Sequence, residues 1–355
     1  MTQRAQRKMY SLFRPLLFAL DPETSHQLTL QLLRVAGDFP LSNFLLSQLY
    51  KIESKPVHAF GLKFKNPIGL AAGYDKDGVA VRGLAALGFG HIEVGTVTPQ
   101  AQAGNPRPRV FRLVEDEAVI NRMGFPSKGM EYVSRRLLRL DLDTAKSTPT
   151  RPAARNDIIL GINLGKNKDT PLEEAAQDYI KLMKVFAPLA DYLTINISSP
   201  NTVGLRRLQG REMLEGLLGE IANARVGAEH APPLLVKISP DMSEEELDDA
   251  VGVILDKKMD GIISANTTIS REGIWSNLKG ENGGLSGSPL KGRSEAVLRQ
   301  VVKRVEGKVP IVSVGGIASP EEAKKRLALG ASLVQVYTGL IYRGPGLVKQ
   351  ILKNL

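Results

Sequence analysis

Two runs near the end of the chain decide the fold: Ile311-Val-Ser-Val-Gly-Gly-Ile317 and Leu333-Val-Gln-Val-Tyr-Thr-Gly-Leu340. Each is a short β-branched stretch that leads into glycine, and a helical segment lies between them. Their apolar residues are nearly continuous instead of alternating, which is typical of parallel strands covered by helices on both faces. The two runs therefore predict one strand–helix–strand unit of an α/β fold.

The same pattern recurs from about residue 66 onward and gives eight predicted strands: Asn66–Gly73, His91–Thr98, Asp157–Gly165, Tyr192–Ser199, Pro233–Ser239, Gly261–Thr268, Pro310–Ile317 and Ser332–Leu340. Eight such units fit a (β/α)8 barrel of the TIM type. An open doubly wound sheet is the competing fold, but no Gly-x-Gly-x-x-Gly sequence opens a helix after the first strand. A long insertion, residues 99–156, interrupts the alternation, and its end, residues 141–156, is predicted to be an exposed loop.

Composition narrows the functions that this chain can have. Its 355 residues, 43% hydrophobic and 24% charged, suit a barrel with an appendage. The chain has no cysteine, which excludes disulfides, cysteine nucleophiles and iron–sulfur clusters. Its four histidines are far apart, so no metal site is expected. The net charge of +10 suits an anionic ligand or membrane, and the low aromatic content, 5%, weighs against nucleic acid.

The first fifty residues are predicted to be helical and to contain no strand. Apolar side chains recur at helical spacing over residues 9–20, and Asp21-Pro22 then supplies an N-cap and a first-turn proline. Gly37 is expected to end this second helix, and Ser42–Tyr50 forms a third. The helices either pack on the barrel as a hairpin or face an anionic membrane surface with nearby basic residues, Arg4, Arg7, Lys8 and Arg14.

The N-terminal segment does not resemble a targeting signal. No apolar run approaches the roughly 20 residues of a spanning helix. Arg14 and Pro15 interrupt the apolar stretch, and no small-x-small cleavage pattern follows it. We expect the segment to be part of the mature protein, and its Met1 without a clear transit peptide to indicate a bacterial source.

Polar residues gather at the carboxyl ends of the predicted strands, where barrel enzymes place their active sites. The run Leu193-Thr-Ile-Asn-Ile-Ser-Ser-Pro-Asn201 is the richest, because it brings amides and hydroxyls to one strand end. Glycines follow the last two strands, where a barrel often binds phosphate. Lys76 and Lys237 supply positive charge for such an anionic ligand. Since no Walker loop or nicotinamide fingerprint is present, flavin mononucleotide (FMN) is the cofactor that fits these features best.

Eight stretches of the sequence resemble, in order, the motifs of the dihydroorotate dehydrogenase family, and together they extend over nearly the whole chain. They are residues 66–76, 105–112, 121–125, 163–168, 196–202, 266–268, 283–287 and 314–317. The resemblance is to the quinone-dependent, membrane-associated class for two reasons. Ser199 stands where the soluble class has cysteine, and Leu20-Asp-Pro-Glu-Thr-Ser-His26 is similar to the quinone-site helices of the membrane-associated class.

The resemblance implies roles for particular residues. Ser199 is implied as the catalytic base, with Thr202 or a water as a proton relay. The implied flavin contacts are Ala72, Gly73, Tyr74, Asp75, Lys76, Thr96, Asn163, Asn196, Lys237, Ala265, Gly287, Gly316, Tyr337 and Thr338. The implied dihydroorotate contacts are Lys76, Asn121, Arg122, Met123, Gly124, Phe125, Asn196, Asn201, Asn266 and Thr267, and the quinone route is implied at His26, Arg112 and Tyr337. Ala265 departs from the pattern, because relatives carry a hydroxyl residue there.

The implied activity is oxidation of (S)-dihydroorotate to orotate in pyrimidine biosynthesis, with one FMN per subunit and ubiquinone or menaquinone as acceptor. The implied partners are the substrate, the quinone and an anionic lipid surface, without nucleic acid or an obligate protein partner. The expected location is the cytoplasmic face of the bacterial inner membrane, or the mitochondrial inner membrane in a eukaryote. Residues 1–50 are the membrane and quinone extension, and residues 51–355 are the catalytic barrel. The alternatives are another FMN barrel oxidoreductase, such as a dihydrouridine synthase, or a non-catalytic membrane-surface barrel.

Overall fold

The structure is a computed structural model, and it describes residues 3–142, 158–226 and 231–355. Residues 143–156 of the predicted exposed loop lie outside these ranges. Residues 141–142 end helix α5 instead of forming loop.

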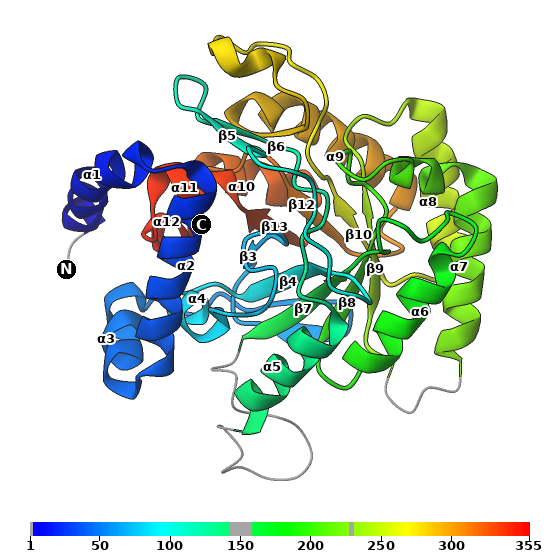
Figure 1. The fold of residues 1–355 in the computed structure, drawn as a ribbon, viewed down its shortest axis with the longest axis horizontal. Coiled ribbons are helices and arrows are strands. Elements are labelled where there is room, and N and C mark those ends of the chain that lie inside the picture. The colour runs from blue at the N-terminus through cyan, green and yellow to red at the C-terminus, as the bar shows by residue number, and fades with distance from the viewer. Residues whose placement is uncertain (1–2, 143–157, 227–230) are drawn as a thin grey trace.

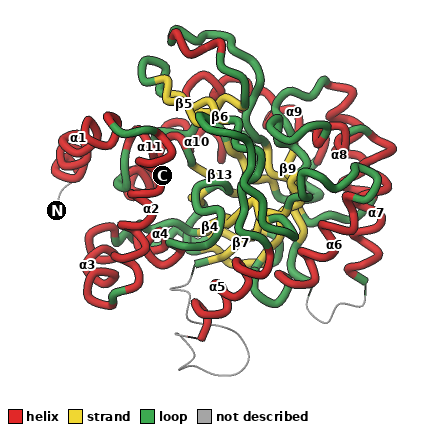
Figure 2. The backbone as a smooth tube through the Cα atoms, viewed as in Figure 1, coloured by secondary structure: helices red, strands yellow, loops and turns green. Residues whose placement is uncertain are grey.

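Eight parallel strands close into a barrel, which confirms the predicted (β/α)8 architecture. The strands are shorter than predicted, because the polar residues at their ends belong to loops. Figure 2 shows the strands enclosed by helices and loops. In sheet order the strands are β10 (Gly261–Ser264), β12 (Ile311–Val314), β13 (Leu333–Val336), β3 (Ile68–Leu70), β4 (His91–Val97), β7 (Ile159–Leu164), β8 (Tyr192–Asn196) and β9 (Leu234–Ile238).

Two of the helices that surround the barrel begin at side chains that accept hydrogen bonds from their first N–H groups. Ser243 and Glu246 form a reciprocal capping box at the start of α8, and the Ser319 side chain caps α10. The surrounding helices are α4 (Val81–Ala86), α5 (Met130–Leu142), α6 (Ala175–Phe186), α7 (Arg211–Arg225), α8 (Glu244–Asp256), α9 (Lys291–Val305), α10 (Pro320–Ala328), α11 (Thr338–Arg343) and α12 (Leu347–Asn354).

Two small antiparallel sheets, which were not predicted, flank the barrel. β1 (Val57–Ala59) and β2 (Leu62–Phe64) form a hairpin, and Phe64 packs edge-on against His91 at the start of β4. The hairpin therefore lies at the amino ends of the strands. β5 (Val110–Leu113), β6 (Ala118–Asn121) and β11 (Gly284–Gly287) form the other sheet from two segments far apart in sequence.

The N-terminal extension contains three helices, as predicted: α1 (Gln3–Ala19), α2 (Pro22–Asp38) and α3 (Pro40–Tyr50). Asp21 caps α2 as predicted, because its side chain accepts hydrogen bonds from the amides of Glu23 and Thr24. Figure 1 shows α1 and α2 beside α11 and α12, at the C-terminal end of the chain. The described helices include none that is both long and apolar enough to cross a membrane.

Gly37 does not end α2, which continues to Asp38, so this prediction was wrong. The glycine is required for packing instead. A Cβ atom on Gly37 would lie 2.3 Å from the Gly83 nitrogen on α4, and a Cβ on Gly83 would lie 2.0 Å from the Leu33 carbonyl oxygen. Two facing glycines thus let the backbones of α2 and α4 touch, and this contact fixes the extension on the barrel.

Candidate active site and an adjoining apolar cavity

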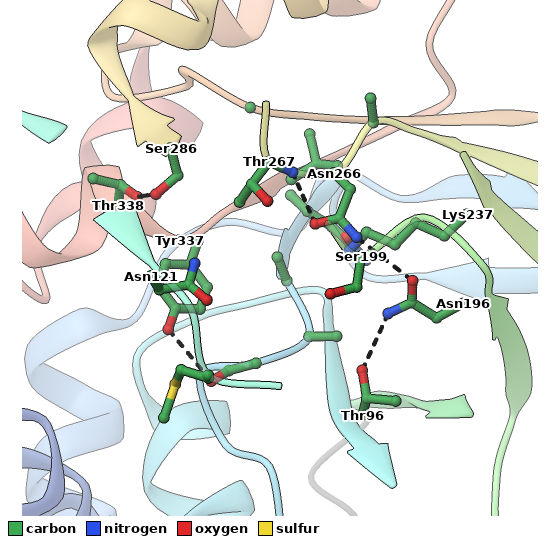
Figure 3. A pocket seen from close by; sticks show the side chains of 18 of the residues that line it. Thr96, Asn121, Asn196, Ser199, Lys237, Asn266, Thr267, Ser286, Tyr337 and Thr338 are labelled. Atoms are coloured by element: carbon green, nitrogen blue, oxygen red, sulfur yellow. Dashed lines mark hydrogen bonds between the residues drawn. The ribbon is translucent and has the colours of Figure 1, made fainter. Parts of the chain in front are cut away.

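A cavity opens at the carboxyl ends of the barrel strands, and most of the predicted site residues line it. In Figure 3, Ser199, Asn196 and Lys237 lie on one side of this cavity, and Tyr337, Thr338 and Ser286 lie on the opposite side. The β5–β6–β11 sheet and the segment after β6 close it from outside the barrel, because Asn121, Met123, Gly124 and Phe125 are lining residues.

Ser199 lies in the loop that follows β8 and lines this cavity. Its side chain is nearly buried, and its Oγ accepts a hydrogen bond of 3.2 Å from the Asn201 amide nitrogen. Thr202 lies three residues further on, and its buried Oγ1 has no hydrogen-bond partner within the described part of the chain. A hydroxyl held by the backbone at the cavity wall can take part in proton transfer.

Side-chain amides from several strands form a connected network beside Ser199. The Asn196 Nδ2 donates to Asn163 Oδ1 at 2.9 Å and to Thr96 Oγ1 at 3.1 Å. The Asn201 Nδ2 donates to Asn121 Oδ1 at 3.1 Å. Because each asparagine both donates and accepts, such a wall can bind a planar ligand that carries imide groups.

Two lysines bring positive charge to this cavity. Burial lowers the pKa of Lys237, while the negative charge of Glu93 raises it. Burial likewise lowers the pKa of Lys76 to about 8, although its ammonium donates to the Gly73 carbonyl oxygen at 2.7 Å. With a pKa of about 8, the Lys76 ammonium still favours binding of an anion near neutral pH.

Glycines after β11 and β12 form a cradle that side chains would fill. Gly315 and Gly316 have φ values of 112° and 73°, which favour glycine. A Cβ atom on Gly316 would lie 2.5 Å from the Lys291 Cα atom. On the other side of the cradle, the hydroxyls of Ser286 and Thr338 are 2.8 Å apart. A cradle of backbone and hydroxyl groups suits a phosphate.

A second cavity lies between the N-terminal helices and the barrel. The three residues predicted for a quinone route, His26, Arg112 and Tyr337, meet in its wall. Most of its other lining residues are apolar, among them Leu17, Phe18, Leu32, Leu33, Leu87, Val110, Val119, Leu340 and Ile341. Burial lowers the pKa of His26 to about 4, so its imidazole is neutral at pH 7.

The two cavities share a wall. Lys76, Asn121, Met123 and Tyr337 line both of them. Across this wall the His26 ring packs edge-on against Tyr74 at 4.9 Å between centroids, and Tyr74 packs against Tyr337 at 5.7 Å. The Tyr337 hydroxyl donates to the Gly73 carbonyl oxygen at 3.3 Å, which fixes the ring.

Four of the residues predicted to contact flavin or dihydroorotate lie elsewhere than in the wall of the first cavity. Tyr74 lines the second cavity, and Asn163 lies buried beneath Asn196. The Asp75 carboxylate accepts from the Val79 and Ala80 amides, and burial raises its pKa to about 6. The Arg122 guanidinium pairs with Glu281.

Sequence reasoning missed several residues of the first cavity, including Ser286, Leu290, Gly315, Gln335 and Gly339. Gly315 and Gly339 stood in motifs already noted as glycine-bearing strand ends, so the signal was present. Gln335 carried no such signal, because only the closure of the barrel brings β13 to the site. Ser286 reaches the site through the pairing of β11 with β6. No cluster of metal-ligating side chains occurs within the described ranges.

The barrel and its polar site at the strand carboxyl ends define an enzyme of the TIM-barrel class. Comparison with known proteins is more specific. The family model described as dihydroorotate dehydrogenase matches residues 55–355, so the chain belongs to the dihydroorotate dehydrogenase family.

Individual relatives agree with this assignment. A protein of Acidithiobacillus ferrooxidans named dihydroorotate dehydrogenase (quinone) is 48% identical over 98% of this chain and 94% of its own length. One from Idiomarina loihiensis with the same name is 46% identical over 98% of this chain and all of its own. The crystal structure of DHODH from Eimeria tenella in complex with ferulenol superposes with a TM-score of 0.84 at 39% identity, and covers 94% of this chain and 90% of that one.

Proposed function

We propose that this chain oxidises (S)-dihydroorotate to orotate, holds FMN in the barrel cavity and delivers the electrons to a membrane quinone in the apolar cavity. The observation that carries the proposal is the pair of cavities, one polar and one apolar, which share Tyr337 and Lys76. Family membership supports the substrate, since the curated relatives are named for dihydroorotate and quinone.

The residues of the barrel cavity fit FMN. The glycine cradle at Gly315 and Gly316 would receive its phosphate, and Lys237 would lie near its ring. When bound, FMN accepts a hydride and returns electrons to a second acceptor. A buried cation such as Lys237 stabilises negative charge on a reduced ring.

The amide wall and Lys76 would bind dihydroorotate. Asn121, Asn196, Asn201 and Asn266 offer donors and acceptors to the imide edges, and the Lys76 ammonium suits the carboxylate. The Ser199 hydroxyl would take the proton from the ring carbon and pass its own proton to Thr202 or to water. The Asn201 amide holds the Ser199 oxygen in place for this transfer.

The N-terminal helices would deliver the quinone from a membrane. Their outer faces expose large apolar side chains, of which Leu12, Leu16 and Leu41 are 74%, 68% and 72% exposed. Such a surface suits the boundary of a lipid layer. Arg14 does not extend toward solvent with these residues, because its guanidinium lies over the Phe18 ring and donates to the Tyr342 carbonyl.

One spectroscopic experiment tests the flavin and both substrates. The purified protein should be yellow, lose its visible absorbance on anaerobic addition of dihydroorotate, and regain it when a short-tailed quinone follows. A colourless protein that binds no added FMN, or a colour that dihydroorotate does not bleach, would overturn the proposal.

Flotation with vesicles tests the membrane surface separately. Full-length protein should float with vesicles that contain anionic phospholipid, and less with vesicles of zwitterionic phospholipid alone. If the protein remains at the bottom of both gradients, the helices do not bind the membrane surface and their role is purely structural.

A further inference from the structure

Glu93 is a buried carboxylate beneath the site that the proposed chemistry does not use. It lies on β4 inside the barrel, has no exposed surface and does not line either cavity described above. An ionised side chain in such a position is costly unless its surroundings compensate for the lost water. The contacts of Glu93 show how this compensation is made.

Three other barrel strands, β7, β8 and β13, each direct a hydrogen-bond donor at this carboxylate. The Asn163 Nδ2 donates to Oε1 at 2.7 Å, and the Gln335 Nε2 and the Tyr192 hydroxyl donate to Oε2 at 2.9 and 3.1 Å. Burial raises the pKa of Tyr192 well above its ordinary value, and the charge of Glu93 raises it further, so Tyr192 remains a donor. His91, beside Gln335, has its pKa lowered by burial to about 3 and is neutral.

The contact with Asn163 fixes the direction of the amide network above it. Because its nitrogen is used by Glu93, the Asn163 oxygen must face Thr96 and Asn196, and it accepts from them at 2.6 and 2.9 Å. The Asn196 oxygen in turn accepts from the Ser198 hydroxyl at 3.0 Å. Glu93 therefore determines which amide edge the cavity wall presents.

The second effect of Glu93 is electrostatic. Lys237 is nearly buried, lines the cavity and stands opposite Asn196 in the pairing of β8 with β9. Burial lowers its pKa, and the charge of Glu93 acts in the opposite direction. An opposite charge favours the ionised form of its neighbour. A carboxylate that the ligands never touch thus acts on the cation of the site.

We propose that Glu93 is a positioning residue, which orients the Asn163 and Asn196 amides and supplies a counter-charge to Lys237 in the wall of the site. This inference rests on the flavin role proposed above. The spectrum of the parent protein is therefore recorded first, because a colourless parent defeats the proposed function, whereas a coloured parent allows the role of Glu93 to be tested alone.

The test uses E93Q, which removes the charge and keeps the shape. The structure can accommodate the new amide, because the buried Gln335 Oε1 has no hydrogen-bond partner among the described residues. After the Gln335 amide rotates, this oxygen can accept from the new NH2 group. The readout is the midpoint potential of the bound flavin, measured between pH 6 and 9.5. Y192F is the matched control, because it removes one donor to the same carboxylate and leaves the charge in place.

The flavin potential of K237M is the value expected when residue 237 carries no charge. We expect the potential of E93Q to fall toward this value at a pH about one unit or more below the pH at which the potential of the parent falls. Y192F should follow the parent, and E93Q should have little further effect in a K237M background. A profile of E93Q that matches the parent, or a potential that rises at every pH, overturns the proposal. A potential that rises at every pH would mean that the charge of Glu93 acts on the flavin directly and not through Lys237.

A second variant covers the case in which E93Q does not retain flavin. E93D keeps the charge on a shorter side chain. Flavin retained by E93D and lost from E93Q supports the role of the charge. Loss from both, in proteins that melt like the parent by circular dichroism, contradicts it, because a side chain that keeps the charge would then fail to hold the flavin as well.

Discussion

Glu23 on α2 forms a bidentate ion pair with Arg109, which precedes β5: Oε1 lies 2.7 Å from Nη2 and Oε2 lies 3.1 Å from Nε. Both side chains are 9% exposed. Arg107 also reaches the same carboxylate, at 3.0 Å, but its side chain is 60% exposed. The pair joins the N-terminal helices to the insertion that covers the active site, so the apolar cavity between them depends on it.

We expect E23Q to destabilise the fold by about 3 kcal/mol, because Arg109 would remain buried without a counter-charge. Chemical denaturation of the two proteins at pH 7 measures the difference. R107Q is the matched control and should cost about 1 kcal/mol or less, since exposed pairs contribute little. Equal losses for the two variants would contradict the role given to Arg109.

The difference between the parent and E23Q should depend on pH. Burial alone would raise the pKa of Glu23, but the hydrogen bonds and the charge of Arg109 outweigh it and lower the pKa below its usual 4.5. A carboxyl with a lowered folded pKa stabilises the fold above its unfolded pKa and loses that effect as the pH falls through the folded value. The free energies of unfolding of the parent and of E23Q should therefore approach each other as the pH falls below about 4.5.

Ser199→Ala should keep its flavin and slow anaerobic flavin reduction by dihydroorotate about 10²–10⁴-fold, the usual contribution of a general base. Stopped-flow absorbance measures this step without the quinone reaction. Ser199→Cys should recover part of the rate, because a thiolate can accept the proton. If the alanine variant reduces its flavin in a single turnover about as fast as the parent, Ser199 is not the general base.

Removal of residues 1–19 should reduce quinone reduction by an order of magnitude or more and leave flavin reduction by dihydroorotate intact. Helix α1, Gln3–Ala19, supplies Tyr10, Leu17 and Phe18 to the apolar cavity. This truncation is sharper than removal of all fifty residues, because α2 and α3 place Leu30 and Tyr50 in the core. A water-soluble electron acceptor serves as the control and should react as fast as with the parent.

Arg326→Leu should weaken FMN binding by about tenfold or more. The guanidinium of this arginine, which is 1% exposed, donates to the Gly315 and Lys291 carbonyls and to the Ser294 hydroxyl, at 3.2, 2.8 and 2.8 Å. Without the guanidinium, the Ser294 hydroxyl must serve both carbonyls alone, so the backbone of the cradle is held less firmly. Fluorescence titration of FMN into flavin-free protein measures the change.

Arg299→Leu is the control for this prediction. Arg299 lies on α9 in the same part of the barrel, but its side chain is 55% exposed and pairs with Glu295. It should bind FMN like the parent. An unchanged affinity of Arg326→Leu would mean that the glycine cradle keeps its shape without the arginine.

The barrel could be predicted because its signal is local. Runs such as Ile311–Val314 and Leu333–Val336 are apolar enough to be recognised as buried strands without knowledge of their neighbours. The β5–β6–β11 sheet could not be recognised in this way, because Gly284–Gly287 is too short and rich in glycine to indicate a strand. It becomes one only by pairing with β6, more than 160 residues away.

The same distinction applies to the site. Asn196, Ser199 and Asn201 lie within one loop, and their composition alone marked them as candidates. Glu93 and Gln335 have no such cluster in the sequence, and their contact exists only because β13 and β4 flank β3 in the closed barrel. Gly37 was misinterpreted for a related reason, since the need for glycine arises from Gly83 on another helix.

The shared wall formed by Lys76, Asn121, Met123 and Tyr337 has a kinetic consequence. Two ligands on opposite sides of one layer of side chains occupy separate volumes, so each can bind while the other is present. A compound that fills the apolar cavity would therefore not be displaced by a higher dihydroorotate concentration, and its inhibition would be noncompetitive with that substrate. The same compound would compete directly with the quinone.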